Sequence, residues 1–179
     1  PAPGPAALPA PPPPARFRVE DSPRELQPAL ARAEAAVKTL REQIAARLAA
    51  EIASVGVARS MAVCRRDAPT LAAAVSAQTG VEVGRIPARL RPGAPPPRPW
   101  IGPLLEETSA KRAADVAPVV VDLGDRVGLL RPVPLAASCL GCHGAADRVL
   151  PEVKLASDGG PGGFSEGDLR GFYWAEAKK

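Results

Sequence analysis

The chain has 179 residues, which suits one domain of ordinary size with some unstructured sequence to spare. Its 23 basic and 19 acidic residues give a formal net charge of +4, but the basic residues are scattered, with no long run and no interleaved aromatic residues. Nucleic-acid binding is therefore not predicted. The most apolar stretch, residues 44–63, is interrupted by Arg47, Glu51 and Arg59, so the sequence also predicts no membrane span.

The first part of the chain is rich in proline and alanine. Residues 1–15 read PAPGPAALPAPPPPA, a composition that disfavours helix and favours an extended polyproline conformation. Such segments act as semi-rigid spacers. We therefore predict an extended arm over residues 1–21.

A long amphipathic helix is predicted over residues 22–64, with its regular part beginning at Pro28. Its apolar residues recur at steps of three or four: Leu30, Val37, Leu40, Ile44, Leu48, Ile52 and Val55. Near Gly56 the apolar face shifts to one that contains Met61 and Cys64. The last turns are therefore expected to pack against a different part of the molecule.

Residues 65–179 combine signals for helices, strands and turns. The predicted elements are a short helix over 70–78, a strand over 81–86, a helix over 103–116, hairpin strands over 119–123 and 127–130, a loop over 159–163 and a last strand over 171–177. The helices come first in the sequence and the antiparallel strands follow. This order predicts an α+β domain, with a long N-terminal helix and an antiparallel sheet.

Cys139, Cys142 and His143 carry the most specific chemical signal. They belong to the run Cys-Leu-Gly-Cys-His, which is the attachment pattern of c-type haem. Two thiols at this spacing reach the two vinyl groups of one porphyrin, and the adjacent imidazole reaches the iron. The sequence thus predicts one haem c, held by two thioethers, with His143 as an axial ligand. The aromatic share of only 3% suits a haem as central packing mass, although a GC-rich genome gives a similar composition.

Three other uses of these cysteines compete with haem attachment. A thioredoxin-like dithiol requires a strand before the motif and a helix after it, whereas Pro132 and Pro134 precede it here. A structural zinc site can combine Cys64 with the three motif residues, but adjacent Cys142 and His143 suit zinc poorly and no second C-x-x-C is present. A plain disulfide gives His143 no role.

The second axial position of the iron is open to more than one donor. His143 is the only histidine, so ligation by two histidines of this chain is excluded. Met61 and Cys64 lie three residues apart on one predicted helical face, and either can be presented to the iron. Cys64 is also the one cysteine left over after thioether formation. Chemistry alone favours neither residue.

Further short motifs accompany the haem run from Val63 to the C-terminus. They are Val63-Cys64, Ala68-Pro69, Trp100, Leu104-Leu105, Cys139-Leu140-Gly141-Cys142-His143-Gly144 and Gly163-Phe164-Ser165-Glu166-Gly167-Asp168-Leu169-Arg170-Gly171. Together they resemble the bacterial haem c domains with a PAS-like fold. Their G-D-x-R-G ending makes the combination more specific than the haem motif alone. The sequence departs from that family at residues 91–95, where an Asn-rich segment is expected.

The resemblance implies that Cys64 is the thiolate ligand of the iron, with Met61 as the alternative. It also implies a PAS-like haem c domain over residues 65–179. Arg170 near the end of the last motif is a candidate partner of a haem propionate, and a surface salt bridge to Asp168 is the equally weighted alternative.

These observations favour a monohaem c-type cytochrome that is not an enzyme. Haem attachment takes place in an oxidising compartment, so we expect an exported protein in the periplasm or outside the cell. Electron transfer and redox or gas sensing both fit a His/Cys-ligated haem, and the mildly basic surface suits an acidic redox partner. The alternative is a subunit of a multi-cytochrome assembly or polymer, in which neighbouring cytochromes or copies of this chain form a homo-oligomer.

Overall fold

A five-stranded antiparallel sheet forms the centre of the molecule. The computed structural model describes residues 13–90, 93–108, 110–147, 149–151, 153 and 162–179. The strands follow the order β1-β3-β4-β5-β2. Their bounds are β1 (Arg16–Arg18), β2 (Glu82–Pro87), β3 (Val119–Asp122), β4 (Arg126–Pro134) and β5 (Leu169–Lys178). The predicted α+β class, with a long N-terminal helix and an antiparallel sheet, is confirmed.

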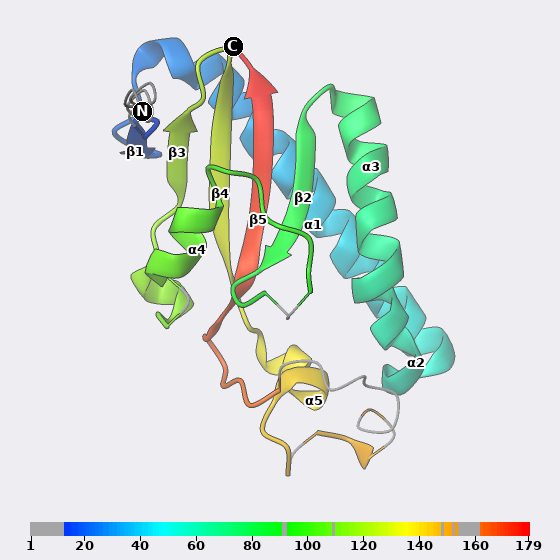
Figure 1. Cartoon of the computed structure of the whole chain (residues 1–179). Coiled ribbons are helices and arrows are strands. Elements are labelled where there is room, and N and C mark those ends of the chain that lie inside the picture. The colour runs from blue at the N-terminus through cyan, green and yellow to red at the C-terminus, as the bar shows by residue number, and fades with distance from the viewer. Residues whose placement is uncertain (1–12, 91–92, 109, 148, 152, 154–161) are drawn as a thin grey trace, which may run out of the picture.

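Helices cover both faces of this sheet and one of its ends. They are α1 (Gln27–Val55), α2 (Val57–Ala62), α3 (Ala68–Thr79), α4 (Gly102–Thr108) and α5 (Leu140–His143). Figure 1 shows α1 behind the sheet, α3 beside its β2 edge, α4 in front of it, and α5 beyond the end where α2 also lies. None of the helices in the described part of the chain has the length and hydropathy needed to cross a bilayer.

The two faces of the sheet follow from the alternation of side chains along each strand. Tyr173 lies in the apolar cluster shared with α1 and α3, whereas its neighbour Phe172 lies in the cluster shared with α4. On β4, Leu129 and Leu130 divide in the same way. The α1 side is built mainly from alanine, valine and leucine, so the helix packs close to the strands.

The long helix is interrupted at the place where its apolar face shifts. It was predicted to run to Cys64, but α1 ends at Val55, and Gly56 has a φ of +79° that breaks the helix. The short helix α2 follows, and then a π-helical turn, Val63–Asp67, leads into α3. The predicted helix over 70–78 is confirmed within α3, which ends at Gly80 with a left-handed φ of +69°.

Other boundaries differ from the prediction because distant segments pair with them. The helix predicted over 103–116 is replaced by the shorter α4 and a 3₁₀ turn, because Arg112 forms a bridge with Asp168. Within the predicted arm, Arg16–Arg18 form the edge strand β1 against β3. Residues 1–12, and most of the loop predicted over 159–163, lie outside the described residues.

A close contact between strands explains one glycine of the G-D-x-R-G ending. Gly171 on β5 pairs with Pro87 on β2. A Cβ atom at position 171 would meet the backbone oxygen of Ile86 at 2.3 Å, which is closer than van der Waals contact allows. Gly171 is therefore needed for these two strands to approach.

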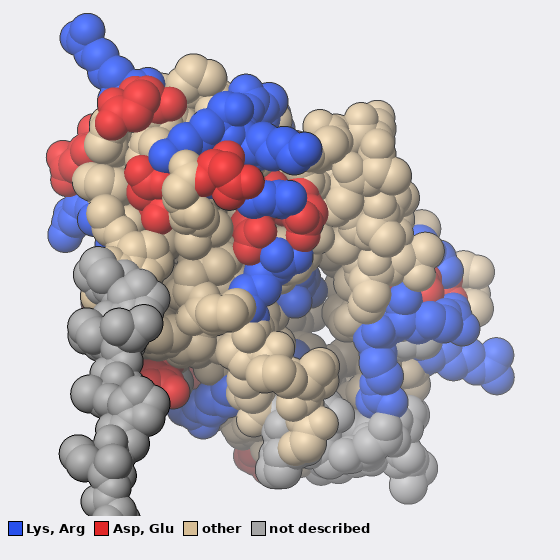
Figure 2. Space-filling view, turned by 45° about the horizontal axis from the view of Figure 1, so that its top comes forward, with Lys and Arg blue, Asp and Glu red and all other residues tan. Residues whose placement is uncertain are grey.

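At the end of the sheet opposite α5, the described acidic and basic side chains form ion pairs, so they make no patch of a single charge there. Arg98 donates to the buried Glu176 at 2.8 Å and to Glu82, and Arg126 donates to Glu82 at 2.6 Å. Trp100 Nε1 also donates to Glu176, at 2.8 Å. These two arginines hold the pKa of the Glu82 carboxyl below its usual value. Figure 2 shows basic and acidic groups interleaved in this way on the upper part of the molecule.

Candidate haem site

The haem-attachment run forms a single helical turn directly after the longest central strand. β4 extends to Pro134, so a strand does precede the motif, contrary to the expectation from Pro132 and Pro134. The prolines are tolerated because this end of β4 pairs only with β5. A 3₁₀ turn at Ala137–Cys139 leads into α5, which ends at His143. Directly after His143 the described chain does not continue the helix that a thioredoxin-like dithiol requires after its motif.

His143 is fixed by the segment that opens the C-terminal motif. The amide of Phe164 donates to the backbone oxygen of His143 at 3.0 Å, and the amide of Gly163 donates to Gly144 at 2.7 Å. The Phe164 ring meets the His143 imidazole edge to face, with centroids 6.5 Å apart and an interplanar angle of 88°. Such an aromatic contact contributes about 0.5–1.5 kcal/mol beyond burial. It also restricts the orientation of the imidazole.

Arg170 also contacts the Phe164 ring. Its guanidinium carbon is 5.6 Å from the centroid of the Phe164 ring, a cation–π contact. The carboxylate of Asp168, the other candidate partner of Arg170, accepts from Arg112 at 3.3 Å and from the amide of Ser165 at 2.7 Å. Through its contact with Phe164, Arg170 supports the ring that packs on His143.

The rest of the C-terminal motif ties β5 to the strand end that carries the cysteines. Gly167 has a φ of +79°, which allows the turn before β5. Its amide donates to the backbone oxygen of Leu135 at 2.9 Å, and the amide of Leu135 donates back to Asp168 at 2.9 Å. Leu135 is only four residues before Cys139. The G-D-x-R-G ending thus positions the haem-attachment turn by backbone contacts.

The structure brings Cys64 to the haem-attachment turn. Cys64 is exposed and lies in the π-helical turn after α2, and α2 contacts α5. Burial, together with the nearby thiols of Cys64 and Cys139, raises the pKa of the Cys142 thiol. All three cysteines therefore lie in one neighbourhood, although they are far apart in sequence. A π-helical turn is common at functional sites because its extra residue redirects the side chains around it.

Met61 lies one turn before Cys64, on α2. It is partly buried, and its helix is the one that contacts α5. The structure therefore brings the helix of Met61 to the haem-attachment turn, and it brings the Cys64 thiol close enough to affect the pKa of Cys142. Among the described residues, no three His, Cys, Asp or Glu side chains converge closely enough to hold a metal ion by themselves.

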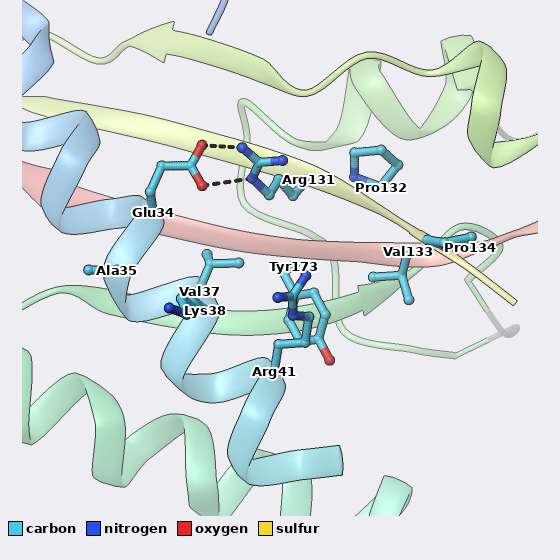
Figure 3. Close-up of a pocket in the computed structure, with 10 residues that line it drawn as sticks. All are labelled: Glu34, Ala35, Val37, Lys38, Arg41, Arg131, Pro132, Val133, Pro134 and Tyr173. Carbon is cyan, nitrogen blue, oxygen red and sulfur yellow. Dashed lines mark hydrogen bonds and ion pairs between the residues drawn. The ribbon is translucent and has the colours of Figure 1, made fainter. Parts of the chain in front are cut away.

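A groove of about 540 Å³ opens between α1, the end of β4 and the middle of β5. Its lining residues are Glu34, Ala35, Val37, Lys38, Arg41, Arg131, Pro132, Val133, Pro134 and Tyr173 (Figure 3). Burial raises the pKa of the Tyr173 hydroxyl, and the thiols of Cys64 and Cys139 act in the same direction. Arg85 and Arg41 act against that rise.

The described residues fit a haem in their chemistry. Two partly buried thiols and an imidazole at the required spacing lie beside a third thiol and a mixed apolar and cationic groove. Phe164, Tyr173 and the groove residues of α1 were not predicted as site residues. Phe164 belongs to a motif that was recognised only as a pattern, and nothing in the local sequence indicates that Tyr173 faces α1 near the cysteines.

Comparison with solved structures finds a similar fold in the cyanobacterial heme-protein Tll0287, known from a crystal structure. The two chains are 20% identical, with a TM-score of 0.54, and the match covers 88% of this chain and 97% of that chain. The likeness shows the shared fold, a long N-terminal helix on a five-stranded antiparallel sheet. No family model and no curated protein matches the sequence.

Proposed function

We propose that this chain is a monohaem c-type cytochrome domain that transfers electrons or senses redox state or a gas outside the cytoplasm. The observation that carries the proposal is the Cys139–His143 turn, which lies beside Cys64 in a fold shared with a haem protein. Cys139 and Cys142 would hold the haem by adding their thiols across its two vinyl groups. His143 and Cys64 would bind the iron on opposite sides.

When bound, a haem supplies a one-electron redox centre whose potential depends on its axial ligands. The chain's own residues act on that centre by position and environment. Phe164 restrains the His143 ring, and the π-helical turn presents Cys64. An axial thiolate favours ferric iron, so a His143/Cys64 pair would lower the reduction potential.

Electron transfer or sensing is favoured over substrate chemistry. His143 is the only histidine of the chain, so no second imidazole is present as a general acid or base opposite it. Covalent haem attachment suits a periplasmic or extracellular location, and ligation of the iron would give the otherwise unpaired Cys64 a role in that oxidising compartment. The formal net charge of +4 suits a redox partner protein with an acidic surface.

The proposal is tested by the mass of the exported protein. After denaturation, intact mass spectrometry is expected to show the polypeptide plus one haem, because thioether bonds survive unfolding. Elemental analysis of the same sample is expected to show one iron and no zinc. A polypeptide mass without haem, accompanied by zinc, would overturn the proposal.

The second candidate, a subunit of a multi-cytochrome assembly, is favoured by the end of α1. The buried residues of α1 stop at Ile44, whereas Ile52 and Val55 of the same apolar stripe are each 39% exposed. Exposed apolar side chains in one stripe are typical of an interface.

Light scattering after size exclusion tests this candidate on the haem-loaded protein. We expect Ile52→Ser with Val55→Ser to lower the oligomeric mass while the absorption spectrum of the haem stays unchanged. Lys111→Ser is the exposed control. A wild-type protein that is monomeric at all concentrations contradicts the assembly.

A further inference from the structure

The groove between α1 and the sheet contains cations that have no partner in the described part of the protein. Glu34 is the only acidic residue that lines it, and it is held by Arg131 through two hydrogen bonds of 2.7 and 2.5 Å. Lys38 and Arg41 also line the groove and form no hydrogen bond or ion pair with any described residue. The groove therefore has an excess of two positive charges.

The two cations are arranged to meet a ligand together. They are three residues apart on α1, so they lie on the same face of the helix. Figure 3 shows the guanidinium of Arg41 beside the Tyr173 ring, and the Glu34–Arg131 pair at the other end of the groove. The apolar side chains of Val37 and Val133 also line the groove.

The groove lies at the end of β4 that leads into the haem-attachment turn. β4 contributes residues 131–134 to the groove, and the chain reaches Cys139 only five residues later. On β5, Tyr173 pairs with Arg131 of β4, so the two strands line the groove side by side. A group bound near the cysteines can therefore extend into the groove.

We propose that the groove receives the propionate carboxylates of the haem, with Arg41 and Lys38 as their cationic partners and the Tyr173 hydroxyl as a further donor. This inference rests on the proposed function. Carboxylates are the ligands that an arginine fork and a lysine ammonium bind best. The apolar lining matches the porphyrin edge that carries the propionates. Arg170 then keeps a different role, because it packs on Phe164.

Redox titration of the haem-loaded protein tests the inference. Removing a positive charge beside a propionate favours the ferric state, so Arg41→Gln with Lys38→Gln is expected to lower the reduction potential. We expect about a tenfold change in the ferric-to-ferrous ratio at a fixed potential, which corresponds to 59 mV for a one-electron couple. Arg24→Gln with Lys111→Gln removes the same two charges from exposed positions outside the groove and is expected to change the ratio by less than twofold.

The inference is wrong if the double variant titrates like the wild type, or if Arg170→Gln causes the large shift instead. If Arg41→Gln lowers haem loading, Lys38→Gln alone still gives the measurement, with a smaller shift in the same direction. Loss of haem from the wild type itself would refute the proposed function, whereas normal loading with unchanged potentials would refute only the groove assignment.

A second arm distinguishes the haem propionates from a free carboxylate. Citrate is added to the haem-loaded wild type at constant ionic strength, and its binding is followed by calorimetry. We expect no binding, because the groove is already occupied by the propionates. Citrate binding that is lost in Arg41→Gln would show that the groove is open to external carboxylates, and it would overturn the inference.

Discussion

Replacing Cys139 and Cys142 together with alanine is expected to give a protein without covalent haem. Both thiols lie in the single turn that follows β4, and no other described cysteine belongs to that turn. Without them the porphyrin has no thioether bond, although His143 still offers its imidazole. The measurement is the intact mass after denaturation, which should fall from polypeptide plus haem to polypeptide alone.

Cys64→Ala is the matched control for this experiment. It removes the same chemical group from the same neighbourhood, because Cys64 is close enough to Cys142 to raise the pKa of its thiol. We expect Cys64→Ala to keep the full haem mass, since ligation of the iron is not needed for the two thioethers. Equal loss of haem in both variants contradicts the separate roles assigned to the cysteines.

The architecture was largely predictable because its helices and strands have strong local signals. The apolar stripe from Leu30 to Ile44 is the part of α1 that is buried, and the valine run at Val119–Asp122 forms β3 as expected. The shift of the apolar face near Gly56 coincides with the end of α1. The pattern predicted a change of packing partner at this point, but it did not predict that the helix ends there.

The elements that were missed depend on contacts between distant residues. Arg16–Arg18 is too short to carry a periodic signal, and it becomes a strand only because β3 offers an unpaired edge. The helix predicted to reach residue 116 ends early because Arg112 joins the turn at Asp168, 56 residues away. Local helix and strand propensities cannot predict such pairing between residues that are distant in the sequence.

The candidate site divides in the same way. The haem-attachment run was predictable because all of its residues lie in one motif of five consecutive positions. The support of His143 by Phe164 and the groove beside Tyr173 were not, because each joins segments that are brought together only by the sheet. Arg170 was predicted as a propionate partner, which stays untested, and its observed contact is with the Phe164 ring.

Cys64→Ala is expected to abolish a low-spin ferric thiolate signal that Met61→Ala leaves intact. Cys64 lies in a π-helical turn, is exposed, and is coupled electrostatically to Cys142 and to Tyr173. Met61 is the matched comparison, because it is on the adjacent helix α2, which contacts α5. Absorption and electron paramagnetic resonance spectra of the two haem-loaded variants provide the measurement.

The reduction potential gives an independent reading of the same ligand. An axial thiolate stabilises ferric iron, so its loss in Cys64→Ala should raise the potential, whereas loss of a methionine ligand should lower it. The two variants are therefore expected to move the potential in different ways, and only one of them should move it strongly. If Met61→Ala changes the spectrum while Cys64→Ala does not, the iron has a His143/Met61 pair, and a simple electron carrier becomes the better description than a sensor.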